Sequence, residues 1–293
     1  MANSFAAMKE SRQTQIEKLS SEVNKLQGSG APQGDDRFWK PEVDKSGNGH
    51  AIIRFLPAPN NEDVPFVRVF DHGFQGPGGW FIEKSLTTLG QNDPVSEYNT
   101  TLWNSGVESS KDQARKQKRR LSFVSNIYVV KDPTNPHNEG KVFLYKFGKK
   151  IFDKLNDQMN PEFEDEKAVN PFDLWEGTSF RLKMRNVEGF RNYDKSEFDS
   201  PAPLLDDDAK LEEVWKGQYS LQEQIDPSQF KSYDELKSRL YRVLALDGGP
   251  QTSTATVDEQ YAPTPAATAP HVSAVDTADD DDESLSFFKK LAD

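Results

Sequence analysis

The chain has 293 residues, with 36 Lys or Arg against 48 Asp or Glu, and therefore a net charge of −12. It contains no cysteine, which excludes disulfides, thiolate metal sites and a cysteine nucleophile within these residues and is typical of a cytoplasmic protein. No apolar run approaches the ~20 residues of a membrane span, so we expect no membrane contact. The 18 Gly and 18 Pro favour a mixed, mainly β fold, and the 34% hydrophobic content implies that part of the chain is linker or tail.

Residues 1–30 are predicted to form a helix that mediates contacts between copies of the chain. Ile16, Leu19, Val23 and Leu26 repeat at helical spacing, and a Gly-Ser-Gly run at 28–30 ends the pattern. A short helix followed by a linker cannot bury this stripe alone. Packing on another copy, packing on the body of the protein and a solvent-exposed helix remain open.

The body of the protein is predicted to span residues 36–247. Alternating and β-rich runs predict strands at 50–56, 64–70, 80–82, 122–130, 142–147 and 180–187, with a Gly-rich loop at 73–79. Two helices are expected to close the body. The first covers roughly 208–218, and the second covers 233–246 and begins with a capping box of Ser232 and Glu235.

Residues 250–293 are predicted to be a disordered acidic tail that binds partner proteins. Residues 251–293 hold 9 Asp or Glu and 2 Lys, after a linker rich in Thr, Ala and Pro. Apolar side chains beside acids are typical of docking peptides. The residues expected to bind partner proteins are Asp279, Asp280, Asp281, Asp282, Phe287 and Phe288. The acidic run also mimics a phosphate backbone, so it is expected to cover a basic groove when no ligand is bound. A purely solubilising tail is the alternative.

Residues 111–150 are strongly basic, with 11 Lys or Arg and 3 Asp or Glu. Cations beside strand aromatics are what an unpaired nucleic-acid strand requires for its phosphates and bases. The cations expected to bind phosphate in and near this region are Lys116, Lys118, Arg119, Arg120, Lys146, Lys149 and Lys150.

The predicted strand 180–187 carries a second group of cations. Its apolar residues alternate with Arg181, Lys183 and Arg185, which predicts one apolar and one cationic face. Three cations in a row repel each other unless an anion lies on them, so we interpret this row as binding nucleic acid. Protection of a sheet edge against aggregation is the alternative.

Several aromatic residues lie close to these cations in the sequence. Phe143 and Phe147 are expected in the core, whereas Tyr145 and Tyr193 suit a half-exposed stacking site because a phenol tolerates partial hydration. Arg191 is expected either to stack or to bind phosphate. Phe123 and Phe190 complete the set of candidate stacking rings.

No group of residues predicts an enzyme. His50, His72, His137 and His271 are scattered without the spacing of a metalloprotease site. The acids at 206–208 directly precede a predicted helix, where they favour the helix N-terminus. The Gly-rich residues 76–79 lack the Gly-Lys-Ser/Thr continuation of a phosphate-binding loop. We therefore expect no catalytic residues.

Four blocks of sequence, at 46–57, 126–133, 138–150 and 189–194, resemble the helix-destabilising single-stranded DNA-binding proteins of T-even-type bacteriophages. The resemblance covers about residues 36–245. It implies an OB-fold core, a five-stranded Greek-key barrel whose groove takes one DNA strand, with peripheral helices and a small inserted subdomain at about 71–115. It implies DNA contacts at Arg54, Lys118, Arg119, Arg120, Tyr145, Lys149, Phe190 and Tyr193, an aromatic at Phe123, and a further aromatic at Tyr98 or Trp103.

The resemblance also implies contacts with other protein molecules. The N-terminal segment would mediate cooperative binding along DNA through a diluted family motif at Lys9, Ser11, Arg12 and Thr14. The acidic tail would recruit phage replication, recombination and repair proteins in the cytoplasm of an infected bacterial host. A single-stranded RNA-binding translational regulator and a protein-interaction scaffold remain as alternatives.

The structural zinc of the family, held by one His and three Cys, is expected to be absent from this chain. His72 remains, whereas Ser85, Asp93 and Ser96 stand where the family has thiols. Serine is a poor zinc ligand, and one His with one Asp falls short of four ligands. We predict no metal and no cofactor, and we expect other bonds to hold residues 72–98 together.

Overall fold

The structure is a computed structural model that describes residues 35–163 and 165–246. The chain divides into two units, residues 1–38 and 39–293, and the sheet described below lies in the second. In the first unit only residues 35–38 are described, where Arg37 Nη2 lies 2.8 Å from the Asp35 carboxylate. The predicted N-terminal helix and acidic tail lie outside the described residues, together with Lys9, Ser11, Arg12, Thr14, Asp279, Asp280, Asp281, Asp282, Phe287 and Phe288.

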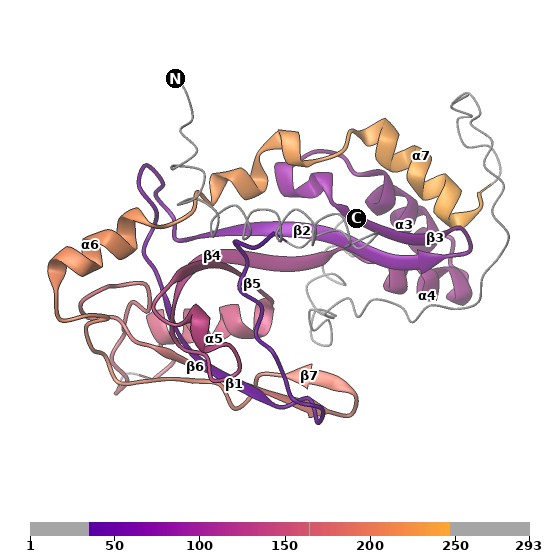
Figure 1. The fold of residues 1–293 in the computed structure, drawn as a ribbon. Helices are drawn as coiled ribbons and strands as arrows, with labels where there is room; N and C mark the ends of the chain where they lie inside the picture. The colour runs from indigo at the N-terminus through magenta and orange to yellow at the C-terminus, as the bar shows by residue number, and fades with distance from the viewer. Residues whose placement is uncertain (1–34, 164, 247–293) are drawn as a thin grey trace, which may run out of the picture. The chain divides into compact units, whose positions relative to one another are not determined.

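An antiparallel sheet dominates the second unit and curls into a half-barrel (Figure 1). In the described residues its strands run in the order β3-β2-β4-β1-β6-β7, with β5 paired to β4 and β8 paired to β6. The strands are β1 (Gly49–Phe55), β2 (Phe66–Gly76), β3 (Gly79–Lys84), β4 (Arg120–Lys131), β5 (Val142–Phe147), β6 (Phe180–Val187), β7 (Phe190–Asn192) and β8 (Glu197–Phe198). The prediction of a mainly β fold with helices is confirmed at this level.

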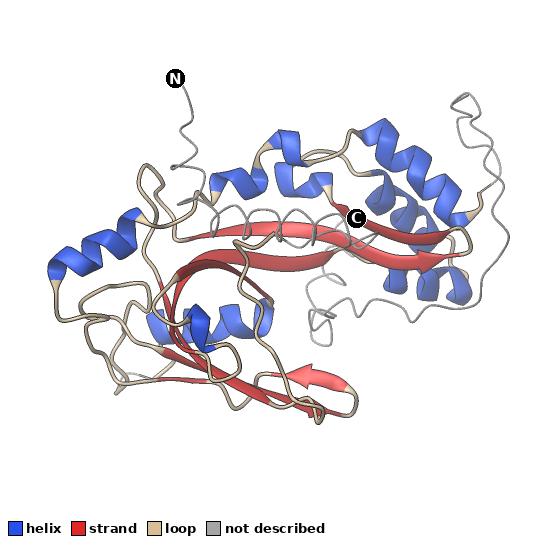
Figure 2. Cartoon of the chain, in the orientation of Figure 1, coloured by secondary structure: helices blue, strands red, loops and turns tan. Residues whose placement is uncertain are grey.

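Helices gather at both ends of the long β2–β4 pair (Figure 2). One end holds α3 (Pro94–Asn104), α4 (Glu108–Gln117) and α7 (Tyr233–Leu244), and the other holds α5 (Lys149–Met159) and α6 (Asp208–Lys216). Short 3-10 turns are η1 (Leu86–Leu89), η2 (Pro136–Asn138), η3 (Gln222–Ile225) and η4 (Pro227–Gln229). Among the helices of residues 35–163 and 165–246, none has the length and apolar content needed to cross a membrane.

Two large apolar clusters lie along the sheet, and a smaller one contains Leu56, Leu174 and Leu211. The barrel cluster lies on the inner face of β1, β4, β5 and β6, and includes Ile53, Phe55, Ile127, Phe180 and Leu182. The hairpin cluster lies between the β2–β3 hairpin and helices α3 and α7, and includes Phe74, Phe81, Val95, Leu236 and Leu240. The long strands β2 and β4 therefore connect two separate cores.

The Gly-rich segment at 73–79 is a strand-turn-strand rather than the predicted loop. Strands β2 and β3 continue to a tight turn, and Gly76 pairs with Gly79. The Gly78 N–H donates to the Val243 carbonyl at 2.8 Å. A Cβ on Gly78 would lie 2.2 Å from the Arg242 carbonyl oxygen, so only glycine admits the end of α7 at this point.

The strand predictions at 142–147 and 180–187 are confirmed to the residue, and the predicted strand at 50–56 is shifted by one residue. The α7 capping box is also confirmed, because the Ser232 and Glu235 side chains each bond to the backbone of the other. Helix α6 begins where predicted and ends two residues earlier. Helices α3, α4 and α5 were not predicted.

Candidate nucleic-acid interface

One face of β2 connects the two clusters. Side chains alternate along a strand, so Phe66, Arg68, Phe70, His72 and Phe74 share this face. Phe66 packs against the barrel cluster and Phe74 belongs to the hairpin cluster. Arg68 and Phe70 consequently lie between the two cores. We call this segment, with Arg119 and Leu121 beside it, the junction.

Two arginines and one aromatic ring meet at the junction. Phe70 pairs with Leu121 across the β2–β4 ladder. The Arg119 Cζ lies 4.2 Å from the centroid of the Phe70 ring, and the Arg68 Cζ lies 5.4 Å from it. Both guanidiniums are therefore within cation–π distance of the same ring.

Burial and two neighbouring charges act on Arg119 at the junction. Burial lowers the pKa of Arg119, the charge of Asp93 raises it, and the neighbouring charge of Arg68 lowers it further. A guanidinium that is partly withdrawn from water beside another cation is stabilised by any negative charge that arrives. A phosphate group at this point would offset both the loss of hydration and the repulsion between the two guanidiniums.

Other predicted cations surround the start of β4. Lys116 is exposed in the last turn of α4, and Lys118 follows directly after that helix. The Arg120 Nη2 donates to the Gly73 carbonyl at 2.7 Å and so ties β4 to β2. The Lys146 Nζ lies 2.5 Å from the Asp71 carboxylate. For Arg120 and Lys146, these contacts already give each cation a partner within the sheet.

The last two predicted cations of this region lie in the first turn of α5. The Lys149 Nζ is 2.9 Å from the carboxylate of Asp153, one turn further along the helix. Lys150 is half-buried. The side chains on α5 are therefore positioned by the helix that begins directly after β5.

Phe123 and Tyr145 are buried in this structure, which corrects the expected half-exposed position of Tyr145, and stacking of either ring on bases stays a prediction. The Phe123 ring stacks on Phe152 with centroids 3.9 Å apart, and the Tyr145 ring packs edge-on against Trp39 at 5.2 Å. Both residues are buried, and burial raises the pKa of Tyr145 well above its ordinary value. The physical reason is register: β5 pairs with β4 so that this face of both strands turns into the barrel cluster. Phe147 is buried there too, as predicted.

Arg54 is buried rather than at the surface, and a DNA contact by this residue stays a prediction. Its side chain is 1% exposed, and its Nη2 donates to the carbonyl oxygens of Asp173 and Ala202 at 3.0 and 2.7 Å. Burial lowers its pKa to about 10, against the opposing charge of Asp173. Arg54 therefore fastens the segment around 173–202 to β1.

The cationic row on β6 carries its own anions. Arg181 is bonded to Asp199, the Lys183 Nζ lies 2.6 Å from Glu197, and the Arg185 Nη2 lies 2.5 Å from Asp194. These hydrogen bonds lower the pKa of both Asp194 and Glu197. Carboxylates of the chain itself therefore offset the repulsion between the three cations. Binding of nucleic acid by this row stays a prediction.

The β6–β7 hairpin presents an aromatic ring at its tip. Glu188 and Gly189 have φ angles of +53° and +90°, which is the conformation of a tight two-residue hairpin turn. Phe190 follows this turn and is 64% exposed. Tyr193 packs on the barrel cluster, and the charges of Tyr193 and Arg191 both act on the pKa of Tyr145. The returning strand thus lies beside the inner face of the sheet.

Tyr98 and Trp103 both lie on α3. Tyr98 packs against the hairpin cluster. Trp103 faces α4, where Lys111 Nζ and Arg115 Cζ lie 5.9 and 5.4 Å from its ring centroid. These contacts join α3 to α4, and a DNA contact by either ring stays a prediction.

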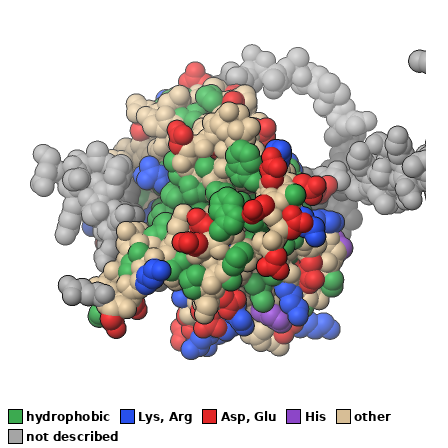
Figure 3. All heavy atoms as spheres, turned by 90° about the vertical axis from the view of Figure 1, so that its left-hand side faces the viewer, with side chains coloured by type: hydrophobic (Ala, Val, Ile, Leu, Met, Phe, Trp, Pro, Cys, Tyr) green, Lys and Arg blue, Asp and Glu red, His purple; other side chains and the backbone are tan. Residues whose placement is uncertain are grey.

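The face on the α6 side differs from the junction. Figure 3 shows acidic side chains scattered through and around a hydrophobic area, with no concentration of basic ones in its centre. Helix α6 itself exposes Asp208, Glu212 and Glu213. This distribution repels a polyanion.

Arg68 and Phe70 were missed at the sequence level. The signal available was the alternation in residues 66–70, where one arginine stands between two phenylalanines on a face that is otherwise apolar. An exposed arginine between two phenylalanines on one strand face marks a point where that face reaches solvent. Only the position of the second cluster shows that such a point exists here.

Comparisons with known proteins place the chain in a family. Residues 47–244 match the family model described as gp32 DNA binding protein like. The chain is 38% identical over 252 residues to the single-stranded DNA-binding protein of Enterobacteria phage T4, covering 83% of each chain. It is 38% identical over 251 residues to that of Enterobacteria phage T2, covering 82% of each. A third relative, from Escherichia phage SV14, is 42% identical over 84 residues, 27% of this chain and 74% of the relative. This chain therefore belongs to the gp32 DNA-binding protein family.

Proposed function

We propose that this chain is a single-stranded DNA-binding protein of phage DNA replication, recombination and repair. The observation that carries the proposal is the extended identity to the T4 and T2 single-stranded DNA-binding proteins, over more than four-fifths of both chains. The junction supplies a chemically suitable place for the strand. No role in catalysis is proposed.

The junction would capture DNA by charge. Phosphates would approach Arg68 and Arg119, with Lys116 and Lys118 adding charge near the end of α4. Each phosphate neutralised on a single strand releases condensed counterions, so the logarithm of the binding constant should fall with the logarithm of salt at about −0.7 per phosphate. Binding would therefore weaken uniformly on all base sequences as salt rises.

Aromatic rings would hold the bases. Phe190 is exposed at a hairpin tip, and Phe70 is half-buried beneath Arg119. Stacking on such a ring adds about 1–3 kcal/mol per base and depends little on which base it is. The combination accounts for binding that is largely independent of sequence. Duplex DNA would melt by mass action, because only the open strand offers its bases to a ring.

We extend the proposal to the parts of the family plan that the resemblance implies. The curled sheet would be a form of the OB-fold, and residues 1–30 would mediate cooperative contacts between copies along DNA. The acidic residues of 250–293 would recruit other phage proteins in the cytoplasm of the infected host.

Deleting residues 1–28 should abolish clustering of the protein on long DNA strands while the affinity for a single site stays unchanged. Deleting residues 251–293 should tighten binding, and unchanged affinity would refute a tail that covers the groove.

The test is a fluorescence titration of oligo-dT and of duplex DNA at two salt concentrations. The proposal expects strong preference for oligo-dT, tighter at low salt, with an affinity that rises with oligonucleotide length. A matched RNA oligonucleotide in the same assay tests the RNA-binding alternative, and preference for RNA would favour it. Absence of length-dependent binding to homopolymer DNA would favour the protein-interaction scaffold.

A further inference from the structure

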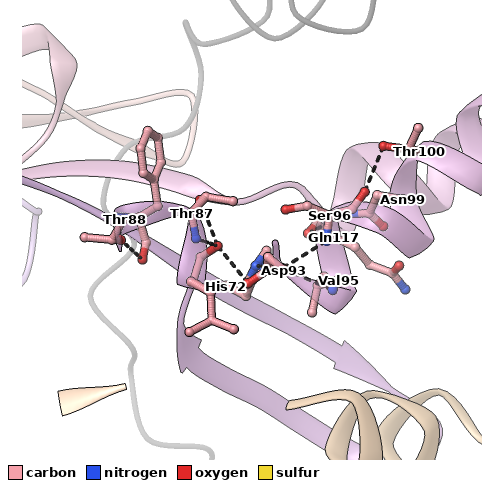
Figure 4. Close-up of polar contacts among 12 residues, drawn as sticks. His72, Thr87, Thr88, Asp93, Val95, Ser96, Asn99, Thr100 and Gln117 are labelled. Atoms are coloured by element: carbon pink, nitrogen blue, oxygen red, sulfur yellow. Dashed lines mark hydrogen bonds and ion pairs between the residues drawn. The ribbon is translucent and has the colours of Figure 1, made fainter. Parts of the chain in front are cut away.

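Residues 72–98 are held together by buried hydrogen bonds around one carboxylate, that of Asp93 (Figure 4). His72 comes from β2, Ser85 precedes η1, and Asp93 is the residue before α3. The side chains of His72 and Asp93 are 0% exposed, and Ser85 is buried as well. Three elements that are separate in the sequence therefore meet at one point in the interior.

The Asp93 carboxylate is saturated with hydrogen-bond donors. Because an ionised carboxylate only accepts, the Nε2 of His72 carries the hydrogen in their contact. Burial raises the pKa of Asp93, but the hydrogen bond and charge of His72, with further hydrogen bonds, lower it well below its ordinary value. The donors and their distances are His72 Nε2 at 3.0 Å, Val95 N at 3.1 Å and Ser96 N at 3.0 Å to Oδ1, and Ser85 Oγ at 2.9 Å and Leu86 N at 3.1 Å to Oδ2.

This arrangement does not fit the zinc ion that the resemblance implies. A structural zinc takes four ligands from Cys, His and carboxylates, and at this point only His72 and Asp93 are of those kinds. Across residues 35–163 and 165–246, no three His, Cys, Asp or Glu side chains come together to hold a metal. A zinc ion on Asp93 would also displace the hydrogen bonds that cap α3.

We infer that the hydrogen bonds of His72, Ser85 and Asp93 take the place of the metal and fasten β2, η1 and α3 together, so that this part of the chain folds without zinc. Charge-assisted hydrogen bonds to a buried carboxylate are the strong ones, and here every one of them joins two different segments or caps a helix. We call this group the Asp93 cluster.

The Asp93 cluster also reaches the junction. The Ser85 N–H donates to the Phe70 carbonyl at 2.9 Å. Thr88 bonds to both polar backbone groups of Phe70: its Oγ1 accepts from the N–H at 2.9 Å and donates to the carbonyl at 3.2 Å. The backbone that carries the Phe70 ring is therefore fixed by residues next to the cluster. The relevance of this contact to DNA rests on the proposed function.

The first test measures metal in the full-length chain. We expect purified protein to contain far less than one equivalent of zinc, and its melting temperature to stay unchanged by EDTA or by added zinc. One equivalent of zinc per chain, whose removal lowers the melting temperature, would overturn the inference. Oligo-dT affinity is measured in the same samples. A chain that is stable without metal but fails to bind oligo-dT would refute the proposed function alone.

The second test compares two Asp→Asn variants at helix N-caps. Asp207→Asn is the control, because Asp207 caps α6 from an exposed position by accepting from Ala209 N. Asn caps as well as Asp, so the melting temperature of this control should change by about 1 °C or less. Asp93→Asn turns an acceptor oxygen into a donor that faces other donors, and should lower the melting temperature by about 4–8 °C.

A milder variant keeps the test decisive if Asp93→Asn fails to fold. Ser85→Ala removes one donor to the carboxylate and should lower the melting temperature by about 2–4 °C. Limited proteolysis should then cut between residues 84 and 96 before it cuts elsewhere. Equal melting temperatures for wild type, Ser85→Ala and Asp93→Asn would overturn the inference.

Discussion

The cations on β6 and those of the junction look alike in the sequence but differ in what surrounds them. On β6, Arg185 and its neighbours each face a carboxylate from residues 194–199. At the junction, Arg119 lies over the Phe70 ring with Arg68 beside it. The first group has its charge neutralised by the fold. The second is partly dehydrated and lies between the charge of Asp93 and that of another cation, Arg68.

The difference teaches that the density of positive charge along a strand does not identify a binding surface. An exposed ion pair contributes little to stability, but it also lowers the attraction that its cation exerts on a polyanion. What decides the function of each group is therefore the residue that lies across from it.

Arg54 adds a third setting to the comparison, a buried guanidinium bonded to backbone carbonyls. Arg54→Met should lower the free energy of unfolding by about 3 kcal/mol, because two buried carbonyls lose their donor. Urea unfolding measures the loss. Oligo-dT affinity, taken where the variant is folded, should match wild type. Normal stability with weakened binding would return Arg54 to the DNA interface.

Removing the junction arginines should give the largest change in DNA binding. Arg68→Ala with Arg119→Ala should weaken oligo-dT binding by about 2 kcal/mol, roughly 30-fold, at low salt. The dependence of the binding constant on salt should also become shallower, by about 1.4 for two phosphates. Titrations at several salt concentrations measure both. A variant that keeps the wild-type salt dependence would show that these arginines do not contact phosphate.

Removing the hairpin-tip ring should have a smaller effect of a different kind. Phe190→Ala should weaken binding by about 1 kcal/mol, the loss of one stacked base. The salt dependence should stay the same, because a ring releases no counterions. Phe190→Trp should restore affinity. A change in salt dependence, or no recovery with tryptophan, would contradict the stacking role.

The β6 cations should give the smallest effect. Arg181→Ala with Arg185→Ala should change oligo-dT affinity by less than about 0.5 kcal/mol, because both side chains already pair with carboxylates at the surface. The same titration as for the junction arginines provides the measurement. A loss equal to that of the junction variant would remove the distinction between the two groups.

Much of the fold follows from the sequence because its signals are local. Strands β5 and β6 and the capping box of α7 depend on alternation and on one Ser–Glu spacing. Helix α4 was missed because its sequence is almost wholly polar, and only Ala114 and Gln117 are buried. The start of α3 did carry a local signal: Asp93 precedes a proline at the first helical position, which is a typical N-cap.

The site was harder to predict because burial depends on which strands pair. Tyr145 and Phe190 are both aromatics near cations, yet β5 turns the first into the barrel cluster and a hairpin exposes the second. The ion pairs of β6 did leave a trace in the sequence. Acids at 194, 197 and 199 follow the turn at 188–189 in the reverse order of their partners at 185, 183 and 181, as residues of a returning segment do.

The central claim is that a single DNA strand lies along the junction and the hairpin tip. Photo-crosslinking of oligo-dT containing 5-iodouracil, followed by peptide mapping, tests it most directly, because this base reacts with rings on which it stacks. The account predicts crosslinks to Phe70 and Phe190, competed by unlabelled oligo-dT. Crosslinks confined to the α6 side, or to residues 180–187, would contradict it.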